Sequence, residues 1–180
     1  MSPKVTALAL IRDMGPLLVG LLMAGRVGAG IGAELAGMRV TEQIDALESL
    51  AINSFKYLVV TRILACILAL PILTTVSNFS GLVGGFIGES LASDMSFHQY
   101  FWRAFDGMDW SDYIPPTIKT VMFGLIIGTV SCFLGYTAQQ GSAGVGRAST
   151  RSVVLSSLLL ILADVILVKV IFFLFPQQAA

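Results

Sequence analysis

Charged side chains inside long apolar runs are the residues of this sequence most able to do chemistry. Arg12 and Asp13 stand at the head of one such run, Arg26 lies within it, and Asp164 lies in the middle of the last run. A charge at the bilayer centre costs roughly 2.5 to 3.5 kcal/mol on insertion scales, so each group should face protein and find a partner. We expect Asp164 to pair with Arg26 or Arg12, and we expect that pairing to be structural.

The sequence contains no familiar catalytic or metal-binding pattern. H-E-x-x-H and G-x-S-x-G are both missing, and the single histidine, His98, lies among the aromatic residues of "SFHQYFW". Cys66 and Cys132 lie in apolar runs, which favours small buried hydrophobic residues over a disulfide or a metal pair. These observations predict neither an enzyme nor a metal site.

Two glycine patterns resemble nucleotide sites but fail in their details. "GAGIGA" fits the loose dinucleotide spacing, yet no strand is predicted before it. "GSAGVGRA" has the glycine spacing of a phosphate loop, but Arg147 stands where lysine belongs and Ala148 where the magnesium-binding hydroxyl belongs. We therefore expect no ATP site on this chain.

The composition indicates the elements that must position these charges. Of the 180 residues 56% are hydrophobic and 12% are charged, and the mean hydropathy is +0.84, far from the usual soluble domain. The net charge is +0 and no basic cluster appears, so nucleic acid is not an expected partner. Runs long enough to cross about 30 Å of hydrocarbon as helices lie at 14–36, 58–82, 117–137 and 152–175. They predict an all-α polytopic membrane helix bundle with about four transmembrane helices.

Charges in the loops predict the orientation of the bundle. The loops 37–57 and 138–151, with the adjoining helix ends, are basic, whereas the loop 89–116 is acidic and aromatic. By the positive-inside rule the two basic loops are cytoplasmic and the acidic loop lies outside. Both termini then lie outside, which leads us to expect a further membrane segment before residue 1.

The acidic loop is also expected to carry a short interfacial helix. Its stretch 97–112 contains Trp102, Phe105 and Trp110, which would anchor it at the membrane surface. Pro71 lies within the span 58–82 and is expected to kink it.

Small residues recur every four positions in the first span. Ala24, Gly28, Gly32 and Ala36 form one row, and such a row allows another helix to approach closely. We predict that two copies of the chain associate through this row.

A polar segment separates the first two spans. It predicts a short amphipathic helix over about 41–52, with Thr41 as its N-cap, Glu42 and Asp45 in its first turns, and apolar residues repeating from Ile44. Two interpretations remain open: a solvated connector resting on lipid headgroups, or a docking helix for a separate cytoplasmic ATPase.

The segment "RDMGPLLVGLLMAGRVGAGIGAELAGMRVTEQIDALESLAI" closely resembles MlaE-type permeases, the membrane subunits of ABC transporters that move phospholipids and related lipids. The resemblance continues through "RILACILALPILT", "KTVMFGLIIG" and "GSAGVGRASTRSVVLSS", so it covers nearly the whole chain. Members of the family usually begin earlier, with an interfacial helix and one more transmembrane helix.

The resemblance implies a transporter assembly in the bacterial inner membrane that maintains outer-membrane lipid asymmetry. Its expected partners are a second copy of the chain, cytoplasmic ATPase subunits that hold ATP and Mg²⁺, a periplasmic MCE-domain lipid-binding protein and a small STAS-domain subunit. The residues that resemble the family's ATPase-coupling helix are Glu42, Gln43, Asp45, Ala46, Leu47 and Glu48.

Arg12 and Asp13 resemble the charged pair at the head of the family's lipid-facing helix. A phospholipid needs apolar surroundings for its tails and a donor for its phosphate, and an arginine suits phosphate. Arg12 is then predicted at the mouth of a lipid path lined by Leu17, Leu18, Leu21 and Leu22. The other interpretation is an ion pair that only fixes helix packing.

Other functional classes compete with the permease. An ion-coupled secondary transporter or channel would be active without a partner, but its proton relay would need a chain of titratable groups, and the charges look isolated in the sequence. A membrane-embedded enzyme has the least support.

Overall fold

The computed structural model describes residues 3–93, 96–106, 110–139 and 141–174. Within these ranges the chain forms helices and no strand, as the sequence predicts. The first helix runs without a break from Pro3 to Val40, and two π-helical turns interrupt its α-helical hydrogen bonding. The helices in chain order are α1 (Pro3–Ala9), η1 (Leu10–Met14), α2 (Gly15–Met23), η2 (Ala24–Gly28), α3 (Ala29–Val40), α4 (Gln43–Ser49), η3 (Phe55–Val60), α5 (Thr61–Ser93), α6 (Phe97–Phe105), α7 (Trp110–Tyr136) and α8 (Ser142–Leu174).

Four helices of the described chain are long and apolar enough to cross a membrane, which confirms the predicted bundle. Each overlaps one of the predicted spans and begins before its predicted start, by about ten residues in the first and last spans. The candidate spans are Lys4–Val40, Phe55–Leu91, Tyr113–Tyr136 and Ser142–Ile171. The helices extend beyond the most apolar segments because polar residues at their ends form helix as readily as apolar ones.

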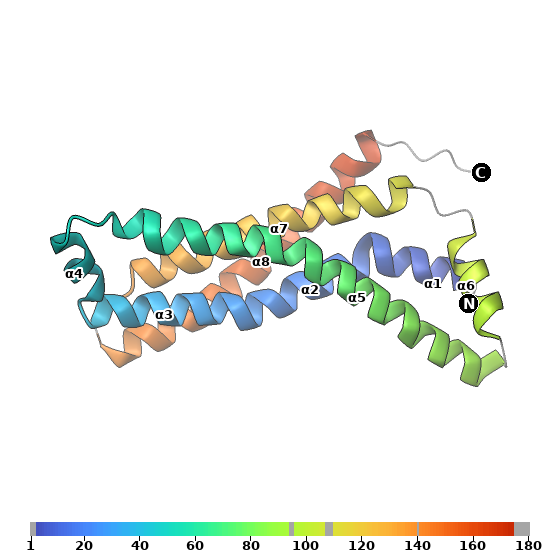
Figure 1. The fold of residues 1–180 in the computed structure, drawn as a ribbon, viewed down its shortest axis with the longest axis horizontal. Helices are drawn as coiled ribbons and strands as arrows, with labels where there is room; N and C mark the ends of the chain where they lie inside the picture. Colours follow the sequence, from blue (N-terminus) through green and yellow to red (C-terminus); the bar gives the residue numbers. More distant parts are fainter. Residues whose placement is uncertain (1–2, 94–95, 107–109, 140, 175–180) are drawn as a thin grey trace.

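Figure 1 shows the arrangement of these helices along one long axis. The short helix α4 and the connection between α7 and α8 lie at one end, and α6 lies at the other end beside the N-terminus. The two basic loops therefore share one end, which agrees with the predicted orientation. Helix α5, which contains Pro71, changes direction along its length, and its second half diverges from α7 toward α6.

The small-residue row of the first helix packs inside the chain. Ala24 and Ala36 are 0% exposed, and a Cβ on Gly28 would lie 3.0 Å from the Ser131 hydroxyl oxygen of α7. A Cβ on Gly32 would collide with Ser152 of α8. The prediction that two copies associate through this row is therefore wrong, because α7 and α8 of the same chain already cover it. Four-residue spacing predicts that a helix approaches, but it does not say which one.

Helices α7 and α5 approach each other closely. A Cβ on Gly124 would lie 2.6 Å from the Cys66 carbonyl oxygen, and one on Gly128 would lie 3.0 Å from the Ile63 Cα. Only glycine permits backbones to approach this closely. Helix α7 thus lies at the centre of the bundle, in contact with α3, α5 and α8.

At the opposite end α6 packs on α1 and is shorter than the predicted 97–112. The Ser96 hydroxyl caps it by accepting a hydrogen bond from the Gln99 N–H, and Tyr100 and Ala104 are buried. Trp102 and Phe105 are exposed, as an interfacial anchor requires. Residues 107–109 and the side chain of the third predicted anchor, Trp110, lie outside the described part of the chain.

Candidate functional site

Three charged side chains meet inside the membrane-spanning part of the bundle. The Lys119 ammonium of α7 donates to Asp13 Oδ1 and to Asp164 Oδ1, at 2.8 Å in each case. The exposed fraction of the side chain is 1% for Lys119, 9% for Asp164 and 56% for Asp13. We call these three residues the charge cluster. It joins the first helix, α7 and α8 through one nitrogen atom.

The first helix positions Asp13 by means of the π-helical turn η1. Gly15 donates its N–H to the Leu10 carbonyl across this wider turn, and a Cβ on Gly15 would collide with the Asn78 side chain of α5. One added residue in a helical turn changes the direction of the side chains that follow, and such turns are frequent at functional sites. Any side chain larger than glycine at position 15 would displace Asn78.

The cluster corrects the predicted charge pairs. Asp164 pairs with Lys119 and not with Arg26 or Arg12, since Arg26 lies on the exposed side of the first helix. Asp13 also pairs with Lys119. The expectation that the buried charges are isolated is wrong as well. Sequence reasoning missed Lys119, although a lone lysine in the apolar third span signals that a carboxylate must lie opposite it.

An accessible apolar strip follows the cluster along α2. Leu18 is 57% and Leu22 is 72% exposed, while Leu17 and Leu21 are half-buried. Residues four apart lie on one helix face, so Asp13, Leu17 and Leu21 stand in line. The residues of the predicted lipid path thus share one side of the first helix, with the half-buried Arg12 at its head.

At the other end of the bundle, α4 is anchored by its apolar side. Ile44 is 0% exposed and packs in a core cluster with Leu35 and Leu58, against which Leu47 also lies. The prediction of Thr41 as N-cap is wrong, because its hydroxyl donates to the Gly37 carbonyl of α3 at 2.9 Å. The chain reverses at the next residue, Glu42, whose φ of 57° is left-handed.

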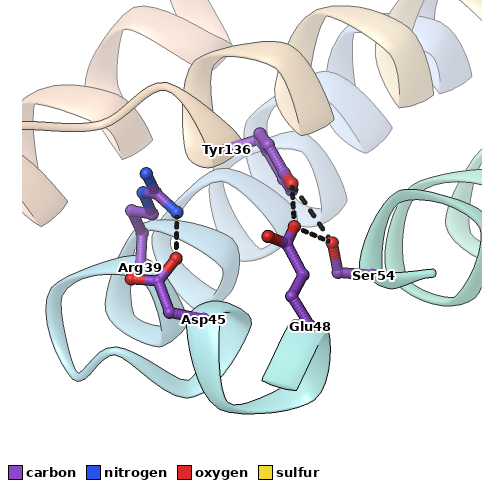
Figure 2. A network of polar contacts seen from close by, with 5 residues as sticks. All are labelled: Arg39, Asp45, Glu48, Ser54 and Tyr136. Carbon is purple, nitrogen blue, oxygen red and sulfur yellow. Dashed lines mark hydrogen bonds and ion pairs between the residues drawn. The ribbon is translucent and has the colours of Figure 1, made fainter. Parts of the chain in front are cut away.

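The acidic side chains of α4 are largely engaged within the chain (Figure 2). Arg39 at the end of α3 pairs with Asp45 at 2.8 Å. The Ser54 hydroxyl donates to Glu48 Oε1 at 2.7 Å, and the Tyr136 hydroxyl of α7 donates to the same oxygen at 3.3 Å.

The predicted coupling residues therefore divide into two groups. Asp45 and Glu48 bind other parts of this chain, and Leu47 is half-buried. The side chains of Glu42, Gln43 and Ala46 are exposed. A partner can contact this second group without competing with bonds inside the chain.

A multi-pass helix bundle with a charge cluster between its spans and a short helix at one end has the architecture of a membrane transport protein. The sequence comparison identifies the family. Residues 1–170 match the family model described as Permease MlaE, and the chain belongs to that family.

Curated relatives agree with this family assignment. The chain is 41% identical over 168 residues to a probable ABC transporter permease protein of Rickettsia prowazekii, a match that covers 93% of this chain and 65% of the relative. A probable ABC transporter permease protein of Synechocystis is 38% identical over 160 residues, covering 89% and 61% of the two chains. One from Pyropia yezoensis is 34% identical over 163 residues, covering 91% and 62%. The chain thus spans less than two thirds of the length of these relatives.

Proposed function

We propose that this chain is the membrane subunit of an ABC transporter that moves phospholipids or related lipids between the inner and outer membranes and so maintains outer-membrane lipid asymmetry. The observation that carries the proposal is the position of α4. This helix joins two membrane-spanning helices, its apolar side is fixed in the bundle by Ile44, and it presents Glu42, Gln43 and Ala46 outward.

Helix α4 is the contact for a cytoplasmic ATPase subunit, which binds ATP and Mg²⁺. A short helix fixed to the bundle on one side moves as a rigid element when its other side is pushed. The exposed carboxylate of Glu42 suits a basic groove on the ATPase, since complementary charge fixes the register of such a contact.

The first helix provides the lipid path. Acyl tails lie along the exposed leucines, Leu18 and Leu22, and the phosphate meets Arg12 at the head of the strip. Lys119 is not the phosphate donor, because two carboxylates already occupy its ammonium and its side chain is 1% exposed. Asp13 is exposed enough to compete with the phosphate for the guanidinium.

The working assembly contains two copies of the chain in the bacterial inner membrane. Two ATPase subunits lie below it, an MCE-domain lipid-binding protein lies on the periplasmic side, and a small STAS-domain subunit accompanies the ATPase. The second copy approaches the open side of the first helix, where a Cβ on Gly25 or Gly30 would meet nothing within 4 Å.

Purification from native membranes, with mass spectrometry of the co-purifying proteins and lipids, tests this proposal. We expect an ABC ATPase, an MCE-domain protein and phospholipid. Glu42→Lys combined with Ala46→Trp changes only the outward side of α4 and should release the ATPase while the chain stays in the membrane. Gln139→Lys, an exposed change in the other loop at the same end, is the matched control. Retention of the ATPase by the double variant would contradict the role of α4.

The charge cluster supports a second candidate, an ion-coupled secondary transporter. Asp13, Lys119 and Asp164 form a chain of titratable groups that a proton relay needs. This candidate predicts ion-driven transport by the purified chain alone. The permease predicts no transport until the ATPase is added, so reconstitution of the chain with and without that partner separates the two.

A further inference from the structure

The central helix α7 touches both the short helix α4 and the charge cluster. Its last residue, Tyr136, donates its hydroxyl proton to Glu48 of α4, and the Tyr136 hydroxyl also lies 3.2 Å from that of Ser54. Seventeen residues earlier the same helix carries Lys119, which holds Asp13 and Asp164. That separation is about 26 Å along an α-helix axis.

The segment of α7 between these two sites is an unbroken α-helix. Its prolines, Pro115 and Pro116, both precede Lys119, so no proline interrupts the hydrogen bonding from there to Tyr136. A displacement of the Tyr136 end therefore reaches Lys119 without being absorbed by a kink.

Two polar contacts hold α4, and they differ in burial. The Arg39–Asp45 pair joins α4 to α3 and is exposed on both sides, with 40% and 57% of the side chains accessible, so water screens it. In the contact with α7, Glu48 is exposed, but Ser54 is 2% exposed and Tyr136 is half-buried with its ring 6.4 Å from that of Phe55. Hydrogen bonds to a carboxylate are stronger than those between neutral groups.

We propose that Glu48, Ser54 and Tyr136 form the link that transmits movement of α4 to α7, and through α7 to the salt bridges of Lys119. The three are positioning residues and touch neither lipid nor nucleotide. This inference rests on the proposed function, since it assigns the internal step between the ATPase contact and the lipid path. Glu48 thus acts toward the bundle and not toward the ATPase.

The test is the amount of lipid transferred per ATP hydrolysed by the intact complex in proteoliposomes containing a labelled phospholipid. Tyr136→Phe removes only the hydroxyl and keeps the ring against Phe55. We expect ATP hydrolysis to stay near the wild-type rate, while transfer per ATP falls about tenfold, the change expected from losing a charge-assisted hydrogen bond. Tyr57→Phe, an identical change at an exposed tyrosine near the same end, should leave the ratio unchanged.

Two further variants separate transmission from simple stability. Glu48→Gln keeps an acceptor oxygen for both hydroxyls and should retain most of the transfer per ATP, whereas Glu48→Ala should lose as much as Tyr136→Phe. The double variant Glu48→Ala/Tyr136→Phe should be no worse than either single one, because the same contact is lost.

Three results would overturn the inference. The first is a wild-type amount of lipid transferred per ATP in Tyr136→Phe, and the second is additive losses in the double variant. The third is loss of assembly in Tyr136→Phe, which would make the contact structural. Failure of the proposed function has a different signature, because the wild-type complex itself would then show no ATP-driven lipid transfer.

Discussion

Replacement of Lys119 by methionine is the sharpest perturbation of the charge cluster. The substitution keeps the length and most of the volume of the side chain but removes the ammonium that both carboxylates share at 2.8 Å. Asp164, with a side chain only 9% exposed, then loses its cation in an apolar surrounding. Asp13 lies at the edge of the cluster, with more than half of its side chain accessible.

The expected cost follows from this difference in burial. Removing one partner of a buried ion pair typically costs about 3 to 5 kcal/mol, and we expect Lys119→Met to fall in this range. Asp164→Asn should cost less, roughly 1 to 3 kcal/mol, since Lys119 keeps Asp13. Asp13→Asn should cost the least of the three, because Lys119 keeps its bond to Asp164, the more deeply buried carboxylate. Lys119→Met combined with Asp164→Leu removes both buried charges and should recover most of the stability.

The assay is the free energy of unfolding in mixed micelles, measured by denaturant titration for each variant, with Lys169→Met as a control lysine outside the cluster. The order of cost should be Lys119→Met, then Asp164→Asn, then Asp13→Asn. A Lys119→Met protein as stable as the wild type would refute the reasoning, as would an Asp13→Asn protein less stable than Asp164→Asn.

Two other predictions concern packing and pH. Gly124→Ala places a methyl group against the Cys66 carbonyl of α5 and should cost about 1 to 3 kcal/mol of unfolding free energy. The control, Gly30→Ala, adds its methyl group at an open position and should cost none. Equal effects of the two substitutions in the same denaturant titration would contradict the close approach of α5 and α7. Burial raises the pKa of Tyr100, and the charge of Glu89 adds a smaller effect in the same direction. The neutral form of Tyr100 therefore stabilises α6 at neutral pH. This stabilisation should disappear as the pH rises above about 10 and passes through the raised pKa of Tyr100. The phenolate absorbance of the wild type minus that of Tyr100→Phe should therefore titrate above the ordinary tyrosine range, and a titration at or below pH 10 would refute it.

The spans and the class of fold were predictable because run length and hydropathy are local properties of the sequence. The family resemblance followed from motifs spread over most of the chain. The extra length of the helices was not predictable from hydropathy, since polar ends such as the first turns of α8 carry no membrane signal.

The charge cluster was not predictable because its geometry depends on the rotation and register of three helices. Spacing along the chain cannot show that Lys119 on α7 reaches both Asp13 and Asp164. The sequence correctly predicted that Asp164 needs a partner. It could not show that Arg26 lies on the exposed side of the first helix, away from Asp164.

The contacts of α4 also depend on tertiary geometry that spacing along the chain does not show. Its amphipathic pattern predicted a short helix, but the left-handed Glu42 that ends the preceding turn is a non-glycine residue in a conformation that sequence rarely signals. The family resemblance also placed Asp45 and Glu48 at the ATPase contact, but it could not show that Asp45 pairs with Arg39 or that Glu48 accepts a hydrogen bond from Ser54.

ATP-driven transfer of a labelled phospholipid by the reconstituted assembly tests the central claim most directly. Vesicles containing the complete complex should transfer the lipid only with ATP and Mg²⁺, and vesicles containing this chain alone should transfer none. ATP-independent transport by the chain alone, driven by an imposed proton gradient and abolished in Lys119→Met, would contradict the permease and favour an ion-coupled carrier.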